Sequence, residues 1–194
     1  MQSPRPMQLV LALVLGLAPL VAEAHPGAGT HATFLQGMAH PLTGLDHLLA
    51  ILGTGMWAAQ QTGRLRWLLP LCFLAMMVAG AAIGFGTPPP GALDQALAAT
   101  VLLCGLFVAS SLRARSTAAL FASGGFALLH GIAHGVEGPG VGPLAYGVGF
   151  LSTTVLLGGA GFLAASLAQR YQAEGALRLA GGVVAAAGLT LSLV

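Results

Sequence analysis

Six ionisable side chains fall in two short stretches of an otherwise apolar sequence. The first stretch runs from His40 to His47 and the second from His130 to Glu137. Imidazole nitrogens and carboxylate oxygens are the side-chain groups that bind divalent transition metals such as nickel, cobalt, copper and zinc. The two stretches therefore predict a metal site. Its six candidate ligands are His40, Asp46, His47, His130, His134 and Glu137.

The second stretch has the spacing of a helix that presents its ligands on one side. Offsets of four and three residues place His130, His134 and Glu137 on one stripe, provided that the helix persists through Gly135. A His-x-x-x-His pair on a helix is a common way to hold a divalent metal, because one turn brings both imidazoles within reach of one ion. Glu137 would supply a third, oxygen ligand.

The first stretch is expected to open a helix. Pro41 suits the first helical position, which places His40 at or beside the cap. His40 and His47 are then seven residues apart and share a face, with Asp46 about 100° round from His47. Asp46 could ligate a metal, or it could orient an imidazole supplied by another helix.

The elements that position these residues must be surrounded mostly by lipid. Hydrophobic residues make up 56% of the chain and charged residues 6%, with a mean hydropathy of +0.87, which leaves too little polar surface to cover a soluble globule. Seven arginines, dispersed in ones and twos, form no basic patch, so we expect no nucleic-acid partner. Cys72 and Cys104 lie in apolar runs and are expected to pack as small hydrophobes.

Six apolar segments, separated by polar or Pro/Gly breaks, predict membrane spans. We therefore expect an all-α, polytopic membrane helix bundle of about six transmembrane helices. The connections are short, so consecutive helices should be antiparallel neighbours. Gly80-x-x-x-Gly84 predicts close helix packing. The segments are Pro41 to Ala59, Trp67 to Gly86, Leu93 to Leu112, Thr117 to Gly135, Leu144 to Leu167, and Ala176 to Val194.

The N-terminal residues have the pattern of an export signal. Arg5 precedes an apolar stretch from Leu9 to Val21, and Ala22-Glu23-Ala24 is a small-x-small cleavage site. An apolar core of about 13 residues is short for a span. We expect a signal peptide over residues 1–24, cleaved after Ala24, and a single transmembrane domain over residues 25–194.

The arginines of the mature chain indicate its orientation. All of them fall in or beside the first, third and fifth connections, and arginines near helix ends are retained on the cytoplasmic side. The expected location is the bacterial inner membrane, with both mature termini periplasmic. Both histidine-containing stretches then meet at the periplasmic face. Asp94, at the outer start of the third segment, is expected to cap that helix, and joining the site is the alternative.

The signal peptide and the two motifs together resemble the HupE/UreJ family of small bacterial membrane proteins, which are found with hydrogenase and urease accessory proteins. His-Pro-x-x-Gly-x-Asp-His opens the first span and His-Gly-x-x-His-Gly-x-Glu closes the fourth. The resemblance covers essentially the whole mature chain. It implies a nickel permease, with cobalt or other metals assigned to some members. It also implies a functional role for the six candidate ligands named above.

We expect a secondary permease or facilitator that captures a divalent transition metal, nickel foremost, at the periplasmic face. A metal ion and the lipid bilayer are then its partners, and the sequence does not identify any protein partner. No Walker-type sequence is present, so we do not expect ATP hydrolysis. One alternative is a membrane-embedded zinc hydrolase, in which three side chains hold zinc and a carboxylate activates water. Another is a metal-binding accessory protein without transport.

Overall fold

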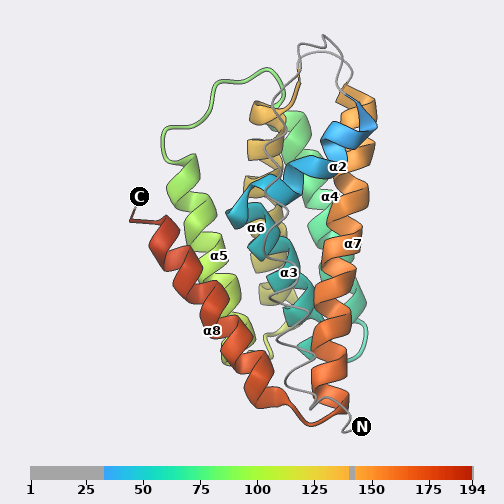
Figure 1. The fold of residues 1–194 in the computed structure, drawn as a ribbon, viewed down its shortest axis with the longest axis vertical. Coiled ribbons are helices and arrows are strands. Elements are labelled where there is room, and N and C mark those ends of the chain that lie inside the picture. The colour runs from blue at the N-terminus through green and yellow to red at the C-terminus, as the bar shows by residue number, and fades with distance from the viewer. Residues whose placement is uncertain (1–32, 140–142, 194) are drawn as a thin grey trace, which may run out of the picture.

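The computed structural model describes residues 33–139 and 143–193, which are almost entirely helical (Figure 1). No strand is present in these two ranges. Helices α3 to α8 coincide, within a few residues at each end, with the six apolar segments, so the predicted all-α class is confirmed. The predicted signal peptide and its cleavage site lie outside the described residues. The helices are α2 (Phe34–Thr43), α3 (Leu45–Gln60), α4 (Leu65–Gly84), α5 (Leu93–Ala109), α6 (Ser116–Glu137), α7 (Pro143–Arg170) and α8 (Glu174–Leu191).

Four helices, α4, α6, α7 and α8, are long and apolar enough to cross a membrane. Their outward faces carry large apolar side chains; Phe121 is 83% exposed and Leu156 is 64% exposed. Lipid can solvate such a surface, whereas water cannot do so favourably. Helices α3 and α5 have only 16 and 17 residues. At about 1.5 Å per residue each is shorter than a hydrocarbon core of roughly 30 Å, so six full spans stay a prediction.

Helix pairing does not follow chain order. The most extensive contacts join α4 to α6, α5 to α8 and α3 to α7. The expectation that consecutive helices are neighbours holds, with smaller contacts, for α3–α4, α5–α6 and α7–α8, and it is wrong for α4–α5 and α6–α7, whose described backbones do not approach closely. Glycines explain the α4–α6 pair. A Cβ at Gly80 or Gly84 would collide with the backbone of α6, and one at Gly131 or Gly135 would collide with that of α4. The packing role predicted for Gly80-x-x-x-Gly84 is confirmed.

The first helical segment begins earlier than expected and then breaks. Thr33 and Gln36 form a capping box that starts α2, and Pro41 lies inside this helix. Gly44 is extended (φ −96°, ψ 116°), and α3 begins at Leu45. The expectation that His40 and His47 share one helix is therefore wrong, because the capping box starts the helix before His40 and Gly44 ends it before His47. In Figure 1, α2 lies obliquely across the upper end of the bundle.

Polar side chains at the far end of α3 hold it against α5. Trp57 Nε1 and Gln61 Nε2 both donate to the Leu112 carbonyl at 2.9 Å, and Gln60 Nε2 donates to the Val108 carbonyl at 2.9 Å. The Val108 carbonyl lies in the last turn of α5 and also accepts from the Ser111 N–H at 3.1 Å, and the Leu112 carbonyl lies just beyond the helix. The three side-chain bonds fix α3 and α5 to each other at the end opposite α2.

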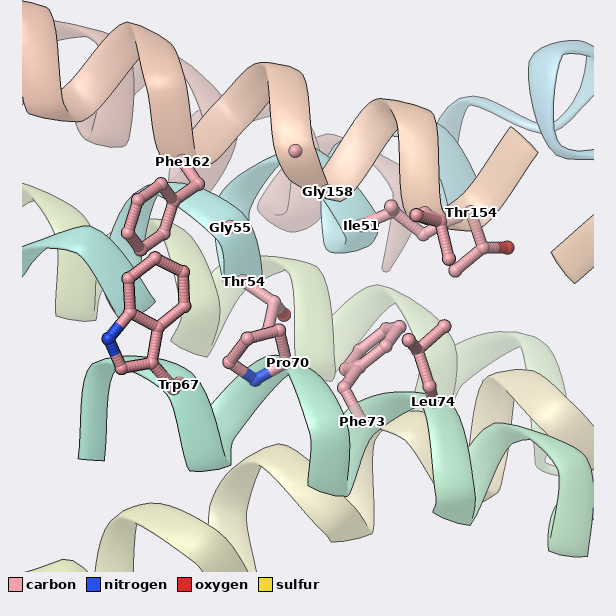
Figure 2. A pocket seen from close by; sticks show the side chains of 12 residues that line it. Ile51, Thr54, Gly55, Trp67, Pro70, Phe73, Leu74, Thr154, Gly158 and Phe162 are labelled. Carbon is pink, nitrogen blue, oxygen red and sulfur yellow. The ribbon is translucent and has the colours of Figure 1, made fainter. Parts of the chain in front are cut away.

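An apolar groove lies between α3, α4 and α7 (Figure 2). Its cavity measures about 220 Å³. At one end the rings of Trp67 and Phe162 stack with centres 5.1 Å apart, and Phe73 and Leu74 lie further along it. No ionisable side chain of the described residues lines this groove. It offers no metal ligands, so any metal site must lie elsewhere.

Candidate metal centre

Four histidines from three helices meet at the end of the bundle that α2 covers. The ring centre of His47 lies 4.3 Å from that of His134 and 4.9 Å from that of His130. The ring centre of His40 lies 4.9 Å from that of His134 and 6.1 Å from that of His47. The two stretches identified in the sequence therefore converge in space. We call these four side chains the histidine cluster.

The alternation of histidine and glycine in α6 explains how this helix serves the cluster. The helix persists through Gly135 to Glu137, as expected. Gly131 and Gly135 face α4, where only glycine fits. Each histidine precedes a glycine and so points about 100° away from it around the helix. His130 and His134 are thereby turned into the bundle, where they are 0% and 2% exposed.

The break at Gly44 brings the remaining ligands into the cluster. A Cβ at this position would lie 3.0 Å from Asp46 Oδ1 and 3.0 Å from His47 Nδ1, which is closer than most real contacts. Glycine therefore leaves room for both side chains, while its extended backbone angles are ones that any residue can adopt. With α2 and α3 at an angle, His40 reaches the cluster from one helix and His47 from the next.

Asp46 orients the imidazole beside it. Its Oδ1 accepts from both the backbone N–H and the ring Nδ1 of His47, each at 2.8 Å. Because an ionised carboxylate can only accept, Nδ1 carries the proton and Nε2 keeps its lone pair. Asp46 therefore orients an imidazole. This imidazole belongs to the next residue, His47, and not to another helix as expected.

Buried nitrogens of the cluster are the strongest chemical signal of the site. His47 Nε2, His130 Nδ1 and both ring nitrogens of His134 have no hydrogen-bond partner among the described residues. Buried polar atoms are normally bonded, and leaving one without a partner costs about 1–3 kcal/mol. A neutral imidazole has one lone pair, so these three rings together offer three nitrogen donors, a set that suits a divalent transition metal.

The spacing of the imidazole rings also suits an ion, although their nitrogens are not arranged to bind one. Two imidazoles that each bind one ion at about 2.0–2.1 Å have ring centres roughly 5 Å apart, close to the separations observed. Nevertheless, within the described residues no group of three or more His, Cys, Asp or Glu side chains is already arranged to hold a metal. An ion could be held here only after the rings rotate toward one another.

The cluster opens to solvent through a cavity of about 160 Å³ between α2, α3 and α5, which we call the vestibule. Exposure falls along it: the side chain of Glu137 is 49% exposed, that of His40 is 23% and that of His47 is 6%. The His40 and Glu137 side chains are 3.2 Å apart, from Nε2 to Oε2. Asp94, in the first turn of α5, also lines the vestibule. The N-cap of α5 is Ala92 and no side chain caps it, so the expectation that Asp94 caps this helix is wrong.

Two further side chains contact the cluster and were not identified from the sequence. Thr100 on α5 lies 2.8 Å from His130 Nε2, and the ring centre of Tyr146 on α7 lies 5.6 Å from that of His40. Neither residue has a motif or a spacing that distinguishes it. Their contacts depend on which helices pair, so local sequence carries no signal for them.

Comparison with known proteins agrees with the motifs. The family described as HupE / UreJ protein matches residues 11–191. Protein HupE of Rhizobium leguminosarum bv. viciae is 37% identical over 174 residues, which cover 89% of this chain and 91% of that protein. No solved structure matches the chain. Because the family match spans nearly the whole sequence and this relative is similar along most of its length, the chain belongs to the HupE/UreJ family.

Proposed function

We propose that the protein is an inner-membrane permease for a divalent transition metal, with nickel as the foremost candidate. The observation that carries the proposal is the histidine cluster, in which imidazole rings from three helices contact one another and those from α3 and α6 have buried nitrogens without a partner in the described part of the chain. Ionisable groups inside a membrane protein are costly and usually mark an ion or substrate path. In a chain with 6% charged residues, this concentration favours ion handling over a purely structural role.

The gradient of exposure suggests an order of events. Asp94 and Glu137 at the vestibule attract a hydrated cation, because clefts lined with one sign of charge concentrate the opposite ion. His40 then meets the ion at the rim, and His47, His130 and His134 replace its water deeper inside. Imidazole donors suit nickel and cobalt and would also accept copper or zinc, so the choice of nickel rests on the family.

The arginines support a periplasmic vestibule. Arg66, Arg113 and Arg178 line one polar pocket, so the three arginine-bearing connections meet at a single end of the bundle. This end is opposite α2 (Figure 1), and residues of α2 line the vestibule. Since arginines near helix ends are retained in the cytoplasm, the proposed orientation places the vestibule and both mature termini in the periplasm.

Uptake of radiolabelled nickel by cells tests the proposal. We expect cells that carry the gene to take up more nickel than cells that lack it, and we expect His47→Ala and His130→Ala to abolish the difference. Thr154→Val is the control, because Thr154 is buried on α7 and, within residues 33–139 and 143–193, its hydroxyl bonds only to the Phe150 carbonyl of its own helix. Equal uptake by the wild type and both histidine variants, at matched protein levels, would overturn the proposal.

Flux into liposomes distinguishes a permease from a protein that only binds metal. Purified protein reconstituted with a nickel-sensitive dye inside the vesicles should show protein-dependent entry of the ion. Tight binding without entry would contradict the permease and favour an accessory protein. Metal retained through purification, together with hydrolysis of a substrate, would favour the membrane hydrolase.

A further inference from the structure

Thr100 lies behind the histidine cluster, on α5, and is buried. Its hydroxyl has two neighbours: Oγ1 is 2.7 Å from the Leu97 carbonyl oxygen and 2.8 Å from His130 Nε2. Both distances are those of short hydrogen bonds. These two contacts determine where the protons lie.

The contact with Leu97 uses the only proton that the hydroxyl has. A carbonyl oxygen can only accept, and two oxygens 2.7 Å apart repel unless a hydrogen lies between them, so Thr100 donates to Leu97. Donation to a carbonyl one turn back is the usual behaviour of threonine in a helix. Toward His130 the hydroxyl can then only accept, and His130 Nε2 must carry the proton.

The second nitrogen of His130 follows from the first. A neutral imidazole has one N–H and one lone pair, so with the proton on Nε2 the lone pair is on Nδ1. This Nδ1 is one of the buried nitrogens without a hydrogen-bond partner in the described part of the chain. Its ring meets that of His47 edge to face, with an angle of 89° between the planes.

We infer that Thr100 is a positioning residue: it holds His130 as the Nε2–H tautomer, so that His130 binds the metal through Nδ1. This inference rests on the proposed function. Asp46 has the opposite effect on His47, whose proton it holds on Nδ1 and whose Nε2 it leaves free. The two rings thus present different nitrogens, each fixed by a partner outside the metal shell. Such partners fix the tautomer and raise the basicity of the ligand.

The tautomer can be read directly by nuclear magnetic resonance. The full chain is purified in detergent with ¹⁵N-labelled histidine, and long-range ¹H–¹⁵N correlations show which ring nitrogen carries the proton. The spectrum is recorded without metal and then with Zn²⁺, a diamagnetic probe. Thr100→Val removes the acceptor at nearly constant shape, Thr100→Ser keeps it, and Thr154→Val controls for loss of a buried hydroxyl elsewhere.

We expect metal-free His130 to be protonated at Nε2, and we expect Zn²⁺ to change the shift of Nδ1. Thr100→Val should mix the tautomers and weaken Zn²⁺ binding by about 10- to 100-fold, a typical effect of removing such a partner. Thr100→Ser should restore both properties. Binding through Nε2, or a Thr100→Val protein with wild-type tautomer and affinity, would overturn the inference alone. A wild type that binds no metal would overturn the proposed function as well.

Discussion

Replacing Gly131 with alanine should move His130, a proposed metal ligand, without removing its side chain. Gly131 follows His130 and faces α4, where the Met77 carbonyl and the backbone of Gly80 occupy the space that a side chain would need. The added methyl carbon would lie 2.9 Å from Gly80 Cα and closer still to the Met77 oxygen. All of these neighbours are backbone atoms, so no side-chain rotation can relieve the collision.

The size of the effect follows from this overlap. Carbon atoms in contact are about 3.5–4.0 Å apart, so relieving the contact with Gly80 Cα requires α4 and α6 to separate by roughly 0.6–1.1 Å, and the closer Met77 oxygen requires at least as much. Metal–ligand distances are held to about 0.2 Å in working sites, so this displacement would withdraw His130 from the ion. We expect metal affinity to fall by about 10- to 100-fold, as for loss of a partner that orients a ligand. Overpacking should also cost about 1–3 kcal/mol of stability.

Gly125→Ala provides the matched control in the same helix. No atom of the described residues, apart from its own helix backbone and chain neighbours, lies within 4 Å of the Cβ that this change would add, so both affinity and melting temperature should stay close to wild type. Nickel affinity is measured by calorimetry on purified protein, and stability by thermal unfolding in the same detergent. If Gly131→Ala binds nickel as tightly as Gly125→Ala does, the contact between α4 and α6 does not position His130, and the reasoning fails.

Three further changes test the gradient of exposure along the vestibule and the helix packing that surrounds the site. His40→Ala should weaken nickel binding less than His47→Ala, because water can replace a ligand at the rim more easily than at a buried site. Calorimetry on both variants measures this difference, and equal losses of nickel affinity would refute the gradient of exposure. Asp94→Asn should raise the KM of nickel uptake several-fold with little change in the nickel affinity of purified protein, since Asp94 lines the vestibule and not the cluster. An unchanged KM would show that Asp94 does not attract the ion into the vestibule. Gln60→Ala should lower stability by about 0.5–1.5 kcal/mol through loss of its bond to Val108, with nickel affinity unchanged, as measured by thermal unfolding and calorimetry.

Much of the fold and of the site could be predicted because hydrophobicity and helical spacing are local properties. Long apolar runs identified α3 to α8, and offsets of four and three residues placed His130, His134 and Glu137 on one helix. The convergence of the two stretches followed from counting spans. The first stretch lies at the start of the first span and the second at the end of the fourth, and in an alternating bundle these two ends lie at the same membrane face. None of these steps needs knowledge of which helices touch.

Features that depend on pairing between helices could not be predicted. The contact between Thr100 and His130 exists because α5 lies behind α6 at that depth, and nothing within either segment specifies this. The break at Gly44 was missed partly for a different reason. Pro41 can begin a helix or lie within one, and the capping box of Thr33 and Gln36, a local signal that was overlooked, decides that the helix begins before Pro41. The close fit of Asp46 and His47 beside Gly44, in contrast, is seen only in the folded chain.

X-ray absorption at the nickel edge tests the central claim most directly, because it reports which atoms surround the ion. Purified protein loaded with one equivalent of nickel should show a shell of nitrogen and oxygen donors with the outer-shell scattering of several imidazoles. Part of this scattering should be lost in His47→Ala and in His130→Ala and retained in Thr154→Val. A nickel ion surrounded by oxygen alone in the wild type, without imidazole scattering, would contradict the assignment of the histidine cluster as the metal site.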